Sequence, residues 1–67
     1  MAVARVTEIS ATSPDSFDDA VKKGLERAAK TIHNIQSAWV KEQNVLLSGD
    51  RISEYKVNML VTFTLDE

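Results

Sequence analysis

The chain has 67 residues and carries a formal net charge of -2, from 8 Lys plus Arg against 10 Asp plus Glu, so it forms at most one domain, expected to span residues 1–67. The slight acidity disfavours nucleic-acid binding, which normally uses a basic patch. The absence of cysteine excludes a disulfide scaffold, a thiolate metal site and a cysteine nucleophile. No apolar run approaches the roughly 20 residues that a membrane-spanning helix needs. Because the N-terminus lacks the apolar core of a signal peptide, we expect a cytoplasmic protein.

The small size of the chain also limits its stability. Below about 70–80 residues, a single core rarely supplies more than about 3–5 kcal/mol. Disulfides are excluded, and the single histidine, His33, makes a closed zinc site improbable. We therefore expect subunit association to stabilise the fold.

The N-terminal half of the chain predicts a strand followed by a helix. Residues 3–9 are rich in β-branched side chains, which favours a strand. Ser13 and Pro14 are typical of a helix start, as N-cap and first helical residue. Apolar residues then recur at spacings of three and four through Ile32, which predicts a helix of about five turns ending near Lys30 and His33. Gly24 lies within this apolar stripe, and its cost of about 1 kcal/mol relative to Ala predicts a close approach to a strand.

The C-terminal half predicts two strands joined by a tight turn. In the strand expected over residues 36–47, Ser37, Trp39, Lys41 and Gln43 should share one face, and Ala38, Val40 and Glu42 the other. The segment 48–51 contains Gly49 and is typical of a hairpin turn. In the strand expected over residues 52–65, one face carries an unbroken apolar row, so this segment predicts the most regular strand: Tyr55, Val57, Met59, Val61, Phe63 and Leu65.

The expected order, β-α-β-β, indicates an α+β fold with a three-stranded sheet. A helical crossover makes the second strand parallel to the first. A wholly antiparallel sheet therefore requires the third strand between them, in the order 1-3-2. One helix can cover only one face, and the other carries Trp39 and Leu60 among polar residues. That exposure indicates contact with another subunit or a ligand.

These segments, taken together, resemble the dodecin family over nearly the whole chain. The likeness rests on the joint spacing of several short segments, none of them a strong motif alone: residues 6–9, 12–14, 24–31, 34–35, 40–42, 54–57 and 61–63. It implies a sheet that partly wraps one helix and a hollow homododecamer of cubic symmetry. It also implies a non-enzymatic role, since many dodecins store riboflavin or FMN, bound in pairs at two-fold interfaces.

The resemblance also identifies the positions that contact flavin, and this chain differs at each of them. Flavin-binding dodecins stack the isoalloxazine ring on a Trp early in the second strand, where this chain has Ser37. The Gln that hydrogen-bonds the ring corresponds to Lys56, and the supporting Arg positions correspond to Asn44 and Thr64. Trp39 stands two residues after the stacking position, roughly 7 Å along the strand.

Three interpretations follow. In the first, the chain forms a dodecin-like shell that has lost flavin binding and is structural, or associated with an ion or small ligand. One family member lacking the flavin Trp binds calcium, and the candidate calcium ligands here are Asp15, Asp18, Asp19, Glu8 and Glu42. In the second, the shell still stores flavin or another planar ligand, stacked on Trp39. In the third, the chain is a generic α+β domain that pairs with a larger partner. Trp39 is interpreted chiefly as an interface residue, and no catalytic motif is present.

Overall fold

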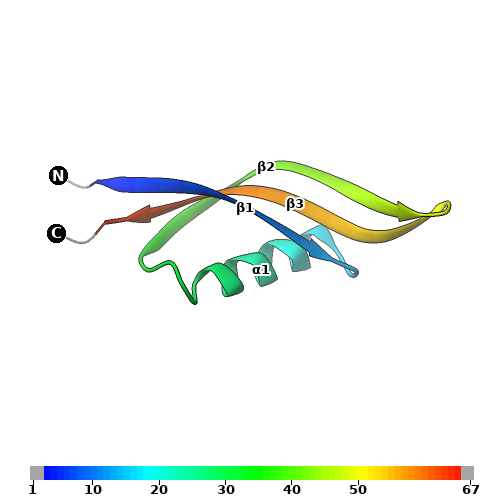
Figure 1. Cartoon of the computed structure of the whole chain (residues 1–67), viewed down its shortest axis with the longest axis horizontal. Helices are drawn as coiled ribbons and strands as arrows, with labels where there is room; N and C mark the ends of the chain where they lie inside the picture. Colours follow the sequence, from blue (N-terminus) through cyan, green and yellow to red (C-terminus); the bar gives the residue numbers. More distant parts are fainter. Residues whose placement is uncertain (1–2, 66–67) are drawn as a thin grey trace.

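The computed structural model describes residues 3–65 and confirms the β-α-β-β order (Figure 1). The elements are β1 (Ala4–Ser13), α1 (Phe17–Ala28), β2 (Ile35–Ser48) and β3 (Arg51–Thr64). The strands form one antiparallel sheet in the predicted order β1-β3-β2. The helix lies on one face of this sheet, and the β2–β3 hairpin extends beyond it. Within residues 3–65, no helix is long and apolar enough to cross a membrane.

The helix begins later than the sequence predicted. β1 continues to Ser13, which pairs with Tyr55 of β3, so Ser13 belongs to a strand and is not the N-cap. The cap is Ser16, whose backbone is extended and whose Oγ accepts a hydrogen bond from the Asp19 amide at 2.9 Å. Pairing with β3 overrides the local Ser-Pro signal, because it satisfies backbone groups along ten residues of β1.

Ser13 has a different role, which links β1 to the helix. Its side chain is buried, accepts a hydrogen bond from the Asp15 amide at 3.0 Å and donates one to Asp19 Oδ2 at 2.6 Å. Asp19 Oδ2 also lies 3.1 Å from Lys23 Nζ, one turn further along the helix, and forms an ion pair with it. The Ser13 hydroxyl and then Lys23 lower the pKa of Asp19, because both stabilise its charged form.

The helix is also shorter than the apolar stripe suggested. It spans 12 residues and ends at the C-cap Ala29, after which the amides of Lys30 and Thr31 bond back to Arg27 and Ala28 in tighter turns. Lys30 and His33 therefore lie beyond the helix, and the predicted C-terminal end of the helix is wrong. Asn34 then adopts a left-handed backbone, with φ of 64°, and the chain enters β2.

The core lies between α1 and the middle of β3. Ala20, Val57, Met59 and Val61 are fully buried, and Phe17 meets Tyr55 edge to face, with ring centroids 5.1 Å apart. A Cβ atom added at Gly24 would lie 2.8 Å from the Ala11 Cβ and 3.0 Å from the Met59 Cε. This confirms that Gly24 allows the helix to approach the sheet closely.

The strand β2 lies outside this core. Nearly all of its residues are exposed, because the helix packs over β1 and β3. The register of β2 against β3 shifts between Val40 and Glu42, which is a β-bulge at Lys41. Because of this bulge, the faces predicted for Glu42 and Gln43 are wrong. Glu42 lies opposite Asn58, on the face away from the helix, and Gln43 lies opposite the buried Val57.

Candidate functional site

The five candidate residues all lie on the sheet face that points away from the helix, here called the outer face. Residues directly opposite each other in a sheet share a face, and Val57, Met59 and Val61 are buried beneath the helix. The alternate residues of β3 therefore point outward. Their β2 partners follow: Ser37 lies opposite Thr62, Trp39 opposite Leu60 and Asn44 opposite Lys56, while Thr64 continues the outward row of β3.

Trp39 is the most prominent side chain of this face, with 65% of its surface exposed. It shares a row across the sheet with Leu60 and Glu8, and Val6, 58% exposed, occupies the next row on β1. We call Val6, Trp39 and Leu60 the Trp39 patch. An apolar surface with a large exposed indole is typical of a contact or stacking site.

Charged and polar side chains border the Trp39 patch. Lys41 Nζ, at the bulge on β2, lies 3.7 Å from Glu8 Oε1 on β1, so this exposed ion pair spans the central strand. In the neighbouring row, the Asn58 amide donates a hydrogen bond to Glu42 Oε1 at 3.5 Å. The residue pattern did not predict this arrangement, because the bulge that turns Glu42 outward has no signature in the sequence.

The proposed calcium ligands do not converge within one chain. Asp19 is engaged by Ser13 and Lys23, and Glu8 by Lys41. Over residues 3–65, no group of three or more His, Asp or Glu side chains is arranged to hold a metal ion. Calcium normally takes six to eight oxygen ligands, so a site of that kind would need ligands from more than one copy.

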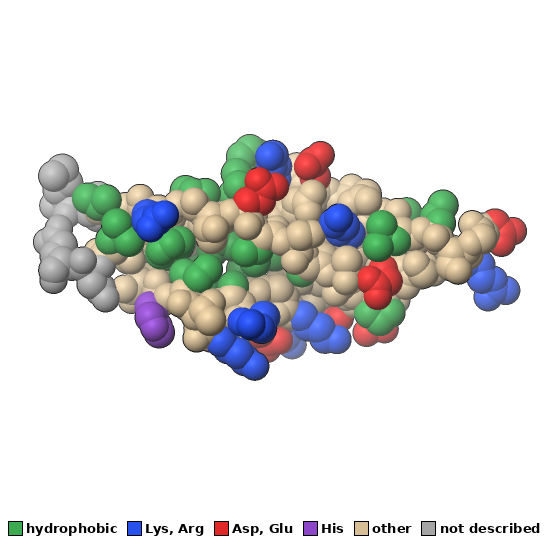
Figure 2. All heavy atoms as spheres, in the orientation of Figure 1, with side chains coloured by type: hydrophobic (Ala, Val, Ile, Leu, Met, Phe, Trp, Pro, Cys, Tyr) green, Lys and Arg blue, Asp and Glu red, His purple; other side chains and the backbone are tan. Residues whose placement is uncertain are grey.

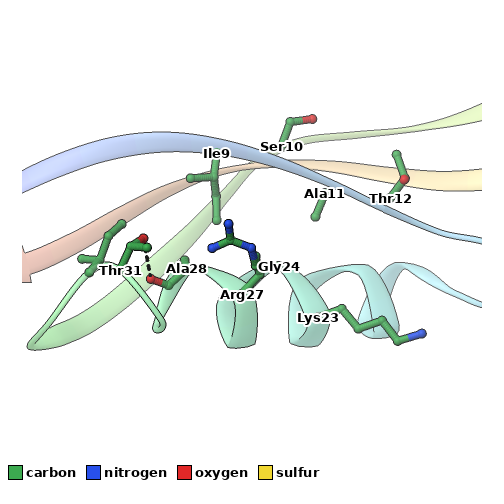
Figure 3. A pocket seen from close by; sticks show the side chains of 10 residues that line it. Ile9, Ser10, Ala11, Thr12, Lys23, Gly24, Arg27, Ala28 and Thr31 are labelled. Atoms are coloured by element: carbon green, nitrogen blue, oxygen red, sulfur yellow. Dashed lines mark hydrogen bonds between the residues drawn. The ribbon is translucent and has the colours of Figure 1, made fainter.

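A cleft lies on the other side of the molecule, between β1 and α1. This β1–α1 cleft has a volume of about 470 Å³ (Figure 3). Its apolar lining includes Ile9, Ala11 and Ile32. The Arg27 guanidinium lies between the helix and β1, whereas the Lys23 side chain points away from the strand. The small residues Gly24 and Ala28 in the helix stripe are the only sequence signal for the cleft.

The fold and the outer face together define a class: a small β-α-β-β protein with a single helix and one broad sheet face that its own chain leaves uncovered. Residues 3–66 match the family model described as Dodecin. The chain therefore belongs to the dodecin family, as the resemblance in its sequence predicted.

Superposition on the structures of relatives confirms the fold over almost the whole length of this chain. The structure of a dodecin from Streptomyces davaonensis is 39% identical and superimposes with a TM-score of 0.95, covering 98% of this chain and 97% of that one. A dodecin mutant from Thermus thermophilus is 30% identical with a TM-score of 0.94, over 100% and 98% of the two chains. The calcium dodecin of Mycobacterium tuberculosis is 29% identical over 97% of this chain and 92% of its own. A crystal structure described as that calcium-chelating dodecin has a TM-score of 0.85, over 96% and 91% of the two chains.

Proposed function

We propose that the protein forms a hollow homododecamer without enzymatic activity, whose flavin-contacting residues have been replaced. It would act as a structural shell, or as a shell associated with an ion or small ligand. The single observation that carries this proposal is the composition of the outer face. It presents an uncovered Trp39 patch suited to subunit contact, while Ser37, Lys56, Asn44 and Thr64 occupy the positions expected to hold flavin.

The chemistry of these four residues supports the loss of flavin binding. Ser37 offers no aromatic plane for stacking. Lys56 donates but cannot accept hydrogen bonds, unlike the amide of Gln. Asn44 and Thr64 lack the forked, permanently charged donor of Arg.

The test combines the mass of the particle with flavin titration. Native mass spectrometry and light scattering should give a particle of about twelve times 7.4 kDa. The purified protein should be colourless and should leave riboflavin and FMN fluorescence unquenched at micromolar concentration. A monomer, or a heterodimer with a larger protein, would contradict the shell. A stoichiometric yellow chromophore would contradict the loss of flavin binding.

The alternative function is flavin binding and storage, and one specific observation favours it. Trp39 is 65% exposed on the same face as the expected stacking position, so it could stack a planar ligand displaced along β2. Quenching of flavin fluorescence by the wild type, abolished by Trp39→Leu in an intact shell, would support this alternative.

Association with calcium is a further form of the proposed function, suggested by the relative described as calcium dodecin. Since the described part of one chain assembles no set of three metal-ligating side chains, we place any calcium site between copies. Calorimetric titration of the assembled shell with Ca²⁺, with Mg²⁺ as control, tests it. Equal heats for both ions, or none for either, would contradict a calcium-selective site.

A further inference from the structure

The end of the β2–β3 hairpin is apolar, and nothing within residues 3–65 covers it. Leu47 is 63% exposed and Ile52 50% exposed, and this end projects past both β1 and the helix (Figure 1). Figure 2 shows exposed hydrophobic side chains close to this tip. A two-stranded ribbon alone in water is marginally stable, so these side chains require a covering surface. We call residues 46–53 the hairpin end.

The β1–α1 cleft has the complementary properties. Its apolar lining comes from Ile9, Ala11 and Ile32, and its volume of about 470 Å³ is open to solvent. It also runs beside β1, which is an edge strand because the sheet order is β1-β3-β2. A free strand edge beside apolar side chains is a surface that proteins normally cover.

The charges of the two features also match. Asp50 is exposed at the hairpin turn, beside Gly49 with φ of +65°. Arg27 lies in the cleft and makes no ion pair within residues 3–65, whereas Lys23 is engaged by Asp19. Arg51 also lies at the turn and would have to point away from Arg27. The hairpin end thus carries the exposed carboxylate of Asp50, and the β1–α1 cleft carries the guanidinium of Arg27, which has no ion-pair partner within residues 3–65.

The two features of one chain cannot meet. β3 pairs with β1 along ten residues and directs the hairpin end away from the cleft along the 50 Å axis of the molecule. We propose that the hairpin end of one copy docks in the β1–α1 cleft of a second copy, with Leu47 and Ile52 on its apolar lining and Asp50 facing Arg27. This inference rests on the proposed shell and names one of its contacts.

Such a contact joins two different surfaces, so it is heterologous and generates a ring when its rotation closes. The Trp39 patch lies on the opposite side of the sheet from the helix and the cleft. It therefore stays available for a second, isologous contact. A closed shell of twelve copies with cubic symmetry needs more than one kind of contact, and these two surfaces can be used simultaneously.

Charge reversal tests the pairing of Arg27 with Asp50. Arg27→Glu and Asp50→Lys, each alone, place like charges together in every copy. Each should raise the concentration for half-assembly about tenfold or more, measured by light scattering, and the double variant should recover most of the loss. Lys30→Glu and Glu26→Lys make the same charge changes at exposed positions outside the cleft and the hairpin. They should leave assembly unchanged. Equal losses in these controls, or no recovery in the double variant, would overturn the pairing.

Cross-linking tests the geometry directly, because the chain has no cysteine. The variant with both Asp50→Cys and Thr31→Cys, treated with a short bismaleimide, should give covalent oligomers beyond the dimer. Each single-cysteine variant should stay monomeric on a denaturing gel.

Dimers from the Asp50→Cys variant alone would show hairpins meeting hairpins and would overturn the proposal. So would an intact twelve-copy particle whose double-cysteine variant forms no cross-link, and in that case the proposed shell would stand. A wild type that does not assemble would instead refute the shell itself. If the intact shell carries extra mass that Arg27→Glu removes, the cleft holds a small anion, and the docking proposal is wrong.

Discussion

Gly24 provides the sharpest test of how tightly the helix packs on the sheet. In an ordinary helix, Gly→Ala stabilises by about 1 kcal/mol. Here the new methyl group would lie 2.8 Å from the Ala11 Cβ and 3.0 Å from the Met59 Cε. The Met59 methyl group ends a flexible side chain and can move. The Ala11 Cβ is fixed to β1, so either the strand or the helix must shift.

The two effects have opposite signs, and their magnitudes decide the outcome. Overpacking a well-packed core costs about 1–3 kcal/mol, which exceeds the gain of about 1 kcal/mol in helix propensity. We therefore expect Gly24→Ala to destabilise the protein by about 1 kcal/mol. For a domain of this size, that corresponds to a fall in Tm of roughly 4–8 °C.

The measurement is the Tm of matched samples at one protein concentration, since association shifts apparent stability. Ala11→Gly removes the atom that the new methyl group would strike. In that background, Gly24→Ala should be neutral or stabilising, so the double-mutant cycle should show coupling of about 1 kcal/mol or more. If Gly24→Ala stabilises the protein while Ala11 is present, the helix does not lie too close to β1 for a Cβ atom at position 24, and the reasoning is wrong.

Three further predictions concern the N-terminal end of the helix and the Trp39 patch. Ser16→Ala should lower the free energy of unfolding by about 1 kcal/mol by removing the N-cap bond to the Asp19 amide, whereas Ser48→Ala should change little in denaturant titrations. Because the folded-state pKa of Asp19 lies below its ordinary value of 3.8, its contribution to stability is complete above about pH 4 and is lost as pH falls through the lowered pKa. The Tm difference between wild type and Asp19→Asn should therefore shrink on acidification, and a difference independent of pH between 2.5 and 7 would refute this. Trp39→Ala should weaken association by about 2 kcal/mol or more per subunit if the indole anchors an interface, giving smaller species in size-exclusion chromatography; an intact particle of unchanged Tm would assign Trp39 to ligand stacking.

The sequence patterns predicted the secondary structure correctly where a single hydrophobic periodicity ran through a whole segment. The alternation along residues 52–65 predicted β3 (Arg51–Thr64) almost to its ends, and Gly49 predicted the turn. The antiparallel order 1-3-2 followed from connectivity alone. The start of the helix was wrong because two competing signals lay close together: Ser13 and Ser16 can both cap, and only pairing of β1 with β3 selects Ser16.

Trp39 and Leu60 were placed on the correct face for a similar reason. Trp39 precedes the bulge, so simple alternation held for it, and Leu60 lies in the unbroken central strand. Glu42 follows the bulge and was assigned to the wrong face. Lys41–Glu8 joins residues 33 positions apart in sequence across a third strand, and no local pattern carries that information.

The sequence by itself determined the element order, the sheet topology and the exposed Trp39, because all of these follow from residue identity and short periods. Only the tertiary structure decided where the helix is capped, which face receives Glu42, and that a cleft opens beside Arg27. Those features arise where strands far apart in sequence pair and pack. Their backbone hydrogen bonds and excluded volume then outweigh propensities worth only a fraction of a kcal/mol per residue.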